Sequence, residues 1–209
     1  MTATALALAP HRTRIPCAEP QPGLVAFAEP SIELERAAAL LLRGADRLGQ
    51  LATDGALADP WPAGSAAGVR ARYVANCLRE LDTFLKGLLD QVAPPALWRP
   101  RRHNAASRVH DVARLPTRDD RRSPPLAILG SDVARLRALG RSRACLWHCH
   151  GLVRRSDRQG DTWMTAGWHA PGSTHLRRYA LGERLTPEGG DLIGVGAFYR
   201  QLAYKIADA

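Results

Sequence analysis

The segment at about residues 66–92 most constrains the fold of this chain. Apolar side chains recur there every three or four positions, which places them along one side of a helix, while charged side chains occupy the remainder. Pro94-Pro95 follows and cannot continue a helix. The apolar stripe comprises Val69, Tyr73, Val74, Cys77, Leu78, Leu81, Leu85, Leu88 and Leu89. A long helix with one apolar side predicts a core of packed helices.

Other segments show the same helical spacing. We expect helices at about residues 31–52, 131–153 and 190–207, and a short helix within 103–113. Gly140 is the weak point of the third of these helices and could mark a kink. The connections are too long for an idealised up-down bundle. The sequence therefore predicts a mainly α fold, a bundle of four to five helices.

The segment 154–190 has a different character. Thr162-Trp163-Met164-Thr165-Ala166 consists largely of residues that favour strands, and glycine and proline punctuate the sequence around it, so we expect a small β-hairpin inserted before the last helix. Residues 1–30 are rich in proline, alanine and glutamate and are expected to form a disordered leader. The remainder, 31–209, is expected to be a single helical domain with a basic linker at 94–130.

Arginine dominates the charge of the chain. There are 29 basic and 20 acidic side chains, a formal net charge of +9, and Lys86 and Lys205 are the only lysines. Two explanations stay open. A GC-rich genome encodes basic positions as arginine, or the guanidinium groups bind phosphate through bidentate contacts. The arginines gather at 99–122 and at 135–158, where the second explanation predicts a nucleic-acid partner, RNA.

Composition also excludes several classes. No window approaches the roughly 18 to 20 uninterrupted apolar residues that a membrane span needs. The cysteines, Cys17, Cys77, Cys145 and Cys149, are too few for a disulfide framework in a chain of this length, and two or more lie in predicted helices. We therefore predict a soluble protein of the reducing cytoplasm that does not bind membranes.

The stretch Arg141 to His150 carries the densest chemistry, and a metal site is one interpretation of it. Cys145, His148 and Cys149 share one side of a helix. A structural zinc ion usually takes two ligand pairs from separate elements, and the other histidines show no paired cysteine spacing. We therefore predict no metal and no other cofactor, and the cysteines are alternatively small core residues.

A catalytic pair is a second interpretation. Seven residues of an ideal helix rotate by about 700°, within about 20° of two full turns. Arg141 therefore aligns with His148 on one face, and Arg143 with His150 on another. Such pairs suit metal-independent RNA cleavage, because a histidine exchanges protons near neutral pH and an arginine stabilises the charge that grows on the phosphorane. In the third interpretation, both histidines are ordinary helix residues and both arginines are solvated.

The arrangement resembles the HEPN superfamily. Arg141, followed by the polar Ser142, precedes His148 with a six-residue gap, and Arg143 precedes His148 with a four-residue gap, on a late helix of a small bundle. Two features depart from the family pattern: serine replaces the usual asparagine, and a tryptophan-containing insertion occupies 161–168. The resemblance implies a metal-independent endoribonuclease of toxin–antitoxin, defence or RNA-processing type. Its composite site would form between two protomers, with Arg141 and His148 catalytic and Arg143 and His150 auxiliary.

A basic and aromatic patch accompanies this stretch. We expect contacts to RNA phosphates and stacking on unpaired bases from Arg101, Arg102, Arg154, Arg155, Arg158, Trp163 and Trp168. In the alternative interpretation the two indoles cover one end of the bundle. The alternative function for the whole chain is a non-catalytic adaptor that binds nucleic acid or a partner protein through its arginines. An antitoxin or regulatory protein is the partner that the toxin setting implies.

Overall fold

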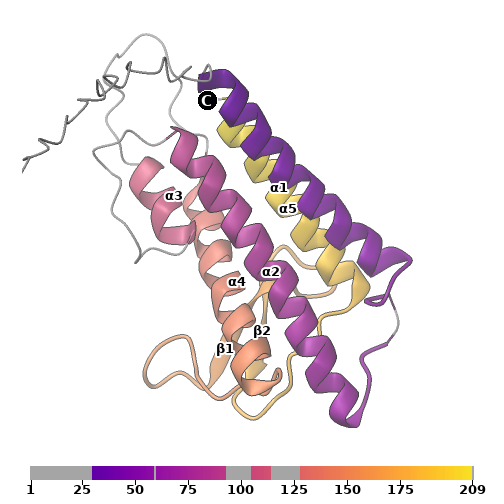
Figure 1. Ribbon diagram of the computed structural model, residues 1–209. Helices are drawn as coiled ribbons and strands as arrows, with labels where there is room; N and C mark the ends of the chain where they lie inside the picture. Colours follow the sequence, from indigo (N-terminus) through magenta and orange to yellow (C-terminus); the bar gives the residue numbers. More distant parts are fainter. Residues whose placement is uncertain (1–29, 59, 93–104, 114–127, 209) are drawn as a thin grey trace, which may run out of the picture.

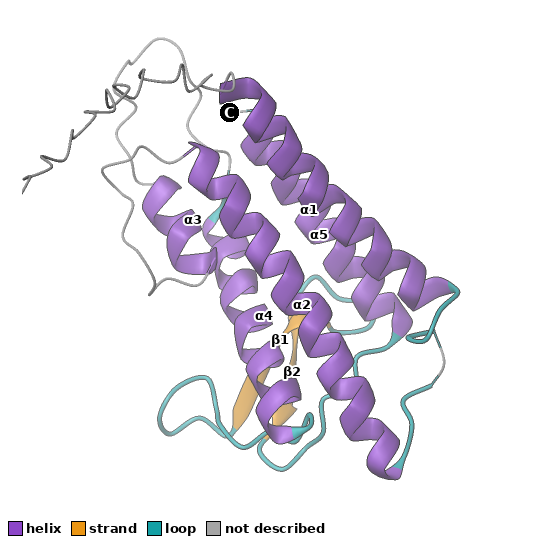
Figure 2. Cartoon of the chain, viewed as in Figure 1, coloured by secondary structure: helices purple, strands orange, loops and turns teal. Residues whose placement is uncertain are grey.

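A computed structural model describes residues 30–58, 60–92, 105–113 and 128–208 of the chain (Figures 1 and 2). The predicted mainly α fold, with a hairpin before the last helix, is confirmed. The leader at 1–30 lies almost entirely outside the described residues, as does most of the basic linker at 94–130. No helix in the described part combines the length and apolarity needed to cross a membrane. The elements are α1 (Pro30–Thr53), α2 (Gly64–Val92), α3 (Ala105–Ala113), α4 (Gly130–Cys149), β1 (Trp163–His169), β2 (Leu176–Ala180) and α5 (Gly189–Ala207).

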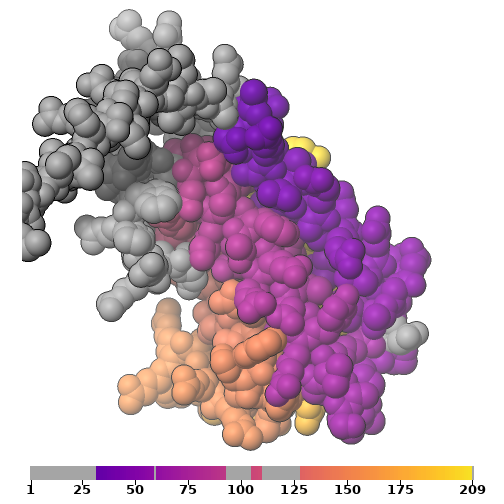
Figure 3. All heavy atoms as spheres, in the orientation of Figure 1, coloured from indigo at the N-terminus to yellow at the C-terminus, as the bar shows by residue number. Residues whose placement is uncertain are grey.

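Helices α1 and α5 lie side by side and run in opposite directions (Figure 1). Small residues at seven-residue spacing face each other along this contact, Ala45 and Ala52 on α1 and Gly196 and Gly189 on α5. A Cβ atom on Gly196 would lie 2.9 Å from the Ala45 carbonyl oxygen, which is closer than a methyl group tolerates. The approach of the two helices therefore depends on glycine. In Figure 3, α5 shows only at the margins, because α1 and α2 cover it from that side.

The apolar side of α2 forms the centre of the core. Its fully or nearly fully buried side chains include Ala71, Val74, Leu78, Leu81, Leu85, Leu88 and Leu89. Two members of the predicted stripe lie outside it, since Val69 is 71% exposed and Tyr73 is 38% exposed. The buried side of α2 centres on the line through Val74 and Leu78. At about 100° per residue, Val69 lies on the opposite side of the helix from Leu78, and Tyr73 lies outside the buried side as well. The core is thus narrower than the sequence pattern predicted.

Helix α4 is continuous across Gly140 but ends earlier than predicted, at Cys149 instead of residue 153. His150 adopts the left-handed conformation, with φ 52° and ψ 33°, and Gly151 follows with φ 86°. The Gly151 N–H donates to the carbonyl oxygen of Cys145 at 3.2 Å, which closes the last turn. The chain therefore reverses direction immediately after Cys149, and the arginines that follow return alongside α4.

The hairpin packs directly on α4. Strands β1 and β2 are antiparallel, with Trp163 opposite Ala180 and Thr165 opposite Arg178, and their register shifts between Thr165 and His169. Within the shift, the three residues 166–168 are all buried. A Cβ atom on Gly167 would lie 2.3 Å from Cγ and 2.8 Å from Cα of Leu139 on α4. Only glycine fits between the strand and the helix at this position.

Two polar side chains of α4 satisfy the backbone of that strand. The hydroxyl of Ser142, which is fully buried, accepts the Gly167 N–H at 3.1 Å. Arg135 donates from Nε to the Gly167 carbonyl oxygen and from Nη2 to the Gly194 carbonyl oxygen, each at 3.1 Å. Its guanidinium also lies 4.4 Å from the centre of the Phe198 ring. Arg135 and Ser142 therefore join α4, β1 and α5 at one point.

The contact at Gly167 yields a stability prediction. Replacing Gly167 with alanine should lower the free energy of unfolding by about 1 to 3 kcal/mol or more, because the methyl group overlaps Leu139. The matched control is Gly140→Ala on α4, where a Cβ atom meets nothing within 4 Å; it should raise the free energy of unfolding by about 0.5 to 1 kcal/mol. Urea unfolding measures the free energy of unfolding of both variants, and equal values would contradict the close contact between Gly167 and Leu139.

Candidate functional site

A pocket of about 380 Å³ lies where α4 meets the loop that follows it and the start of β1. Four of the predicted site residues meet here: Arg141 and His148 from the predicted catalytic pair, and Arg154 and Arg155 from the predicted RNA-contacting set. Arg141 and His148 are two turns apart on α4 and face the same space. Its lining comprises Arg141, Ala144, Cys145, His148, Cys149, Arg154, Arg155, Ser156 and Met164.

The pocket is cationic. Three arginines and one histidine line it, and no carboxylate does. Arg141 is the most enclosed of the arginines, and its Nε lies 2.8 Å from Oδ1 of Asp157 behind it. Arg154 and Arg155 are exposed and form no ion pair with the residues that the structure describes. A ligand that carries a phosphate group or a similar anion is what such a lining favours, because the planar guanidinium matches phosphate oxygens in pairs.

Arg143 and His150 do not join the pocket. Arg143 points toward α2, where its Nη1 lies 3.2 Å from Oδ2 of Asp82. His150 lies beyond the end of α4, and its Nδ1 is 3.4 Å from the position of a Cβ atom built on Gly68 of α2. The left-handed turn at His150 takes it off the helix. The two residues thus lie on the side that faces α2, and the structure gives them no place beside Arg141 and His148.

Ser142, the polar residue after the arginine in the HEPN-like pattern, also faces away from the pocket. Its side chain is fully buried, and its hydroxyl accepts the N–H of Gly167. A helix turns about 100° per residue, so neighbours on α4 point in different directions. Ser142 therefore positions the hairpin and does not contact a ligand in this pocket.

The two tryptophans of the hairpin differ. Trp168 is 1% exposed, and its Nε1 donates to the Tyr179 hydroxyl at 3.1 Å. The prediction that Trp168 stacks on a base is wrong, because the register shift turns its indole into the core. Trp163 is 37% exposed and lies under the guanidinium of Arg178, 5.1 Å from the ring centre.

The remaining predicted RNA contacts lie elsewhere. Arg158 is exposed on the loop between α4 and β1, where its carbonyl oxygen accepts the Ser156 hydroxyl at 2.6 Å. Arg101 and Arg102 fall outside the described residues. The surface arginines that the structure places beside the pocket are therefore those of the loop after α4.

Cys145, the more deeply buried of the two cysteines that line the pocket, behaves as a core residue. Burial raises the pKa of the Cys145 thiol to about 11, with a further increase from Cys149, and its Sγ–H donates to the Leu152 carbonyl oxygen at 3.4 Å. A thiol that stays protonated is a poor metal ligand. Within the described residues, no three side chains of histidine, cysteine, aspartate or glutamate are grouped to hold a metal ion.

One functional residue was missed by the sequence reasoning. Asp157 accepts the Thr165 N–H at 3.0 Å and lies 2.8 Å from Arg141, so it connects the loop, the strand and α4. In the sequence it is one aspartate in a short polar segment, where aspartate is common in turns. It lies sixteen positions after Arg141, and nothing in that spacing indicates a pair.

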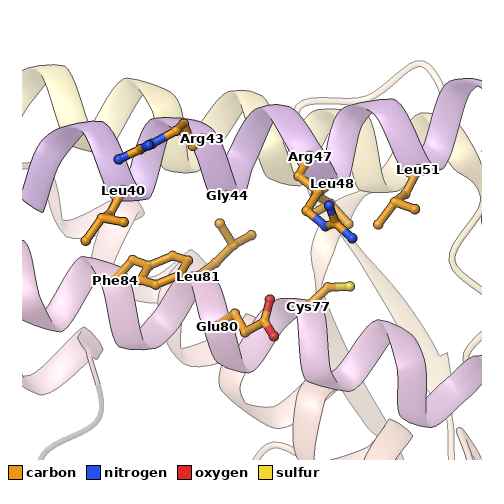
Figure 4. A pocket seen from close by; sticks show the side chains of 10 residues that line it. All are labelled: Leu40, Arg43, Gly44, Arg47, Leu48, Leu51, Cys77, Glu80, Leu81 and Phe84. Carbon is orange, nitrogen blue, oxygen red and sulfur yellow. The ribbon is translucent and has the colours of Figure 1, made fainter.

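A second pocket, of about 290 Å³, lies between α1 and α2 (Figure 4). Its walls are mainly apolar, with Leu40 and Leu51 on α1 and Phe84 on α2, and Arg47 and Glu80 face each other across its rim. None of the predicted site residues lines it. The opposite charges on its rim do not favour an anion, so the cationic pocket on α4 is the candidate functional site.

Comparison of the chain with protein-family models, with curated proteins and with solved structures finds no match. Function therefore follows from the chemistry of the pocket. The fold and the pocket together define a mainly α-helical protein with a cationic site of about 380 Å³.

The role of Ser142 can be tested by its removal. Ser142→Ala should lower the free energy of unfolding by about 1 to 3 kcal/mol, because the buried N–H of Gly167 loses its acceptor. Ser131→Ala, at an exposed position near the start of the same helix, is the control and should change stability by less than about 0.5 kcal/mol. Thermal unfolding of the two variants measures the difference. A stability of Ser142→Ala equal to that of the control would show that the hydroxyl does not hold the strand.

Two thiols, Cys145 in the core and the half-buried Cys77, predict a pH dependence. Burial raises the pKa of Cys77 to about 11 as well as that of Cys145, from the ordinary thiol value of 9.0. The unfolded chain therefore loses these protons first, so stability is complete below about pH 9 and falls as the pH rises toward 11. At pH 8, iodoacetamide should modify both thiols about 100-fold more slowly in the folded protein than in urea. Peptide mapping measures the rates, and equal rates would contradict the burial.

Proposed function

We propose that the chain binds RNA and cleaves it without a metal ion, with one phosphodiester held in the pocket on α4. The observation that supports this most is the lining of that pocket. His148, Arg141, Arg154 and Arg155 meet in one space with no carboxylate among the lining residues. The imidazole is exposed and available to a ligand.

Each side chain has a distinct part in this proposal. Arg141, held from behind by Asp157, stabilises the charge that develops on the phosphorane oxygens. Arg154 and Arg155 bind the phosphate and its neighbour along the strand. Trp163 offers an exposed indole face near the start of β1 for an unpaired base. The net charge of +9 attracts the polyanion at long range.

The proton transfers indicate a dimer. His148 takes the proton of the 2′-hydroxyl, the 2′-oxygen attacks phosphorus, and the bond from phosphorus to the 5′-oxygen breaks. The leaving 5′-oxygen then needs a proton. His148 is the one imidazole that lines the pocket. A second copy of the chain, opposed at this face, would bring its own His148 as the acid, which is the composite site that the HEPN resemblance implies.

The biological setting belongs to the same proposal. A metal-independent endoribonuclease of HEPN type acts in the cytoplasm as a toxin or defence protein, and an antitoxin or regulatory protein would restrain it. Ser142 stands where the family pattern usually has asparagine, and its side chain is fully buried, which leaves Arg141 and His148 as the pair that carries the chemistry. The alternative is an adaptor that binds RNA through the same arginines without cleaving it.

The test uses purified protein, a labelled single-stranded RNA and excess EDTA. Wild type should cleave, and His148→Gln should lose about 100-fold or more of the rate, because a positioned general acid or base contributes at least that much. His150→Gln is the matched control, two residues away and outside the pocket, and should cleave at the wild-type rate.

The outcomes separate the two functions. Cleavage that is lost equally in both histidine variants, or in neither, would contradict the role of His148. If wild type binds the RNA with an affinity that falls steeply as salt rises but does not cleave it, the chain is the adaptor.

A further inference from the structure

Asp157 makes three contacts that no other residue of its loop combines. Its Oδ1 lies 2.8 Å from Nε of Arg141 on α4, and the same oxygen accepts the Thr165 N–H of β1 at 3.0 Å. Its own N–H donates to the Trp163 carbonyl oxygen at 3.1 Å. The side chain is 18% exposed, so these contacts are largely shielded from water.

The ion pair orients Arg141. A guanidinium has five N–H donors in one plane, and Nε is the nitrogen that lies nearest to the Asp157 carboxylate. Its N–H is not aligned with a hydrogen-bond acceptor among the described residues, so the contact is an ion pair without a hydrogen bond. The two terminal nitrogens remain for a ligand, and Arg141 lines the pocket. Without the carboxylate, the long side chain would regain its rotamer freedom, which a phosphate would then have to remove on binding.

The backbone contacts place the loop arginines. Arg154 and Arg155 come two to three residues before Asp157, and the hydrogen bonds to Trp163 and Thr165 hold the loop against β1. This brings the two arginines to the wall opposite α4. Val153, whose N–H donates to the Glu183 carbonyl oxygen and whose carbonyl oxygen accepts the Gly182 N–H, anchors the loop before these arginines, and Asp157 anchors it after them. Asp157 thus contacts Arg141 on one side of the pocket and anchors the loop on the other side.

We propose that Asp157 is the positioning residue of this site: it holds Arg141 and the Arg154–Arg155 loop in the arrangement that binds a phosphodiester. The inference rests on the proposed function for the identity of the ligand. The expected effect of removing Asp157 on RNA binding has an unusual sign. Removing a negative charge from a protein strengthens its binding to a polyanion in general, whereas removal of Asp157 weakens it.

Asp161 provides a control of equal charge. It lies in the same loop, its N–H donates to the Arg158 carbonyl oxygen, and its side chain forms no ion pair with the described residues. Asp157→Ala and Asp161→Ala therefore remove the same charge from the same loop. Only Asp157→Ala also removes the ion pair with Arg141 and the side-chain hydrogen bond to Thr165 of β1.

The experiment measures binding of a single-stranded RNA in EDTA at several salt concentrations. Asp157→Ala should raise the Kd about tenfold, as expected for the loss of one charge-assisted contact. Its slope of log K against log salt should become shallower by about 0.7 or more, since at least one phosphate contact is lost. Asp161→Ala should bind at least as tightly as wild type, and Asp157→Asn, which keeps an acceptor for Thr165, should fall between them.

Two further comparisons separate positioning from a merely structural role. In the Arg141→Ala background, Asp157→Ala should have a smaller effect on binding, because the two residues act together. A lower melting temperature with unchanged Kd and salt slope would show that Asp157 only stabilises the fold. Binding of Asp157→Ala as tight as that of Asp161→Ala would overturn the positioning role and leave RNA binding intact. Failure of wild type to bind RNA would overturn the proposed function and the inference together.

Discussion

The close contact between β1 and α4 at Gly167 is the constraint on which the rest of the structure depends. No side chain fits between the strand and Leu139, and Ser142 and Arg135 of α4 satisfy the N–H and the carbonyl oxygen of that residue. Buried backbone groups without partners would be costly, so the two polar side chains are the reason that an irregular strand can pack on a helix. Arg135 extends the same contact to Gly194 at the start of α5.

The position of the hairpin determines the pocket. Because β1 lies against α4, the chain between them must return along the helix after the left-handed turn at His150. Asp157 fixes that return by bonding β1 and pairing with Arg141. The loop arginines then face His148 across a space of about 380 Å³. The face of α4 alone carries one arginine and one histidine. The strand β1 contributes little charge, but by holding the loop arginines opposite this face it completes a cationic pocket.

The regular parts of this structure could be predicted from the sequence, and the irregular parts could not. Helical spacing located α1, α2 and α5 to within about two residues at each end, because amphipathic periodicity reflects which side of a helix is buried. The same spacing correctly aligned Arg141 with His148. It overextended α4, since the left-handed residue that ends the helix is a histidine and not the glycine that usually marks a helix end of this kind.

The errors at the site have a common cause. Trp168 was expected at the surface, but a register shift in β1 buries it, and strand alternation alone does not show where a shift occurs. Arg135 begins the 135–158 stretch in which arginines gather, yet it joins three elements inside the protein. Asp157 was missed because its partner is close only in space. In each case a contact between distant parts of the chain decided the role of the residue.

An NMR titration tests most directly whether the pocket on α4 binds RNA phosphates. The side-chain resonances of His148 and His150 are followed while a short single-stranded RNA is added in EDTA. The His148 ring signals should shift and saturate with the RNA concentration, while those of His150 stay in place, because of the two histidines only His148 lines the pocket. Shifts at His150 with none at His148, or no shifts at either ring, would contradict binding in this pocket.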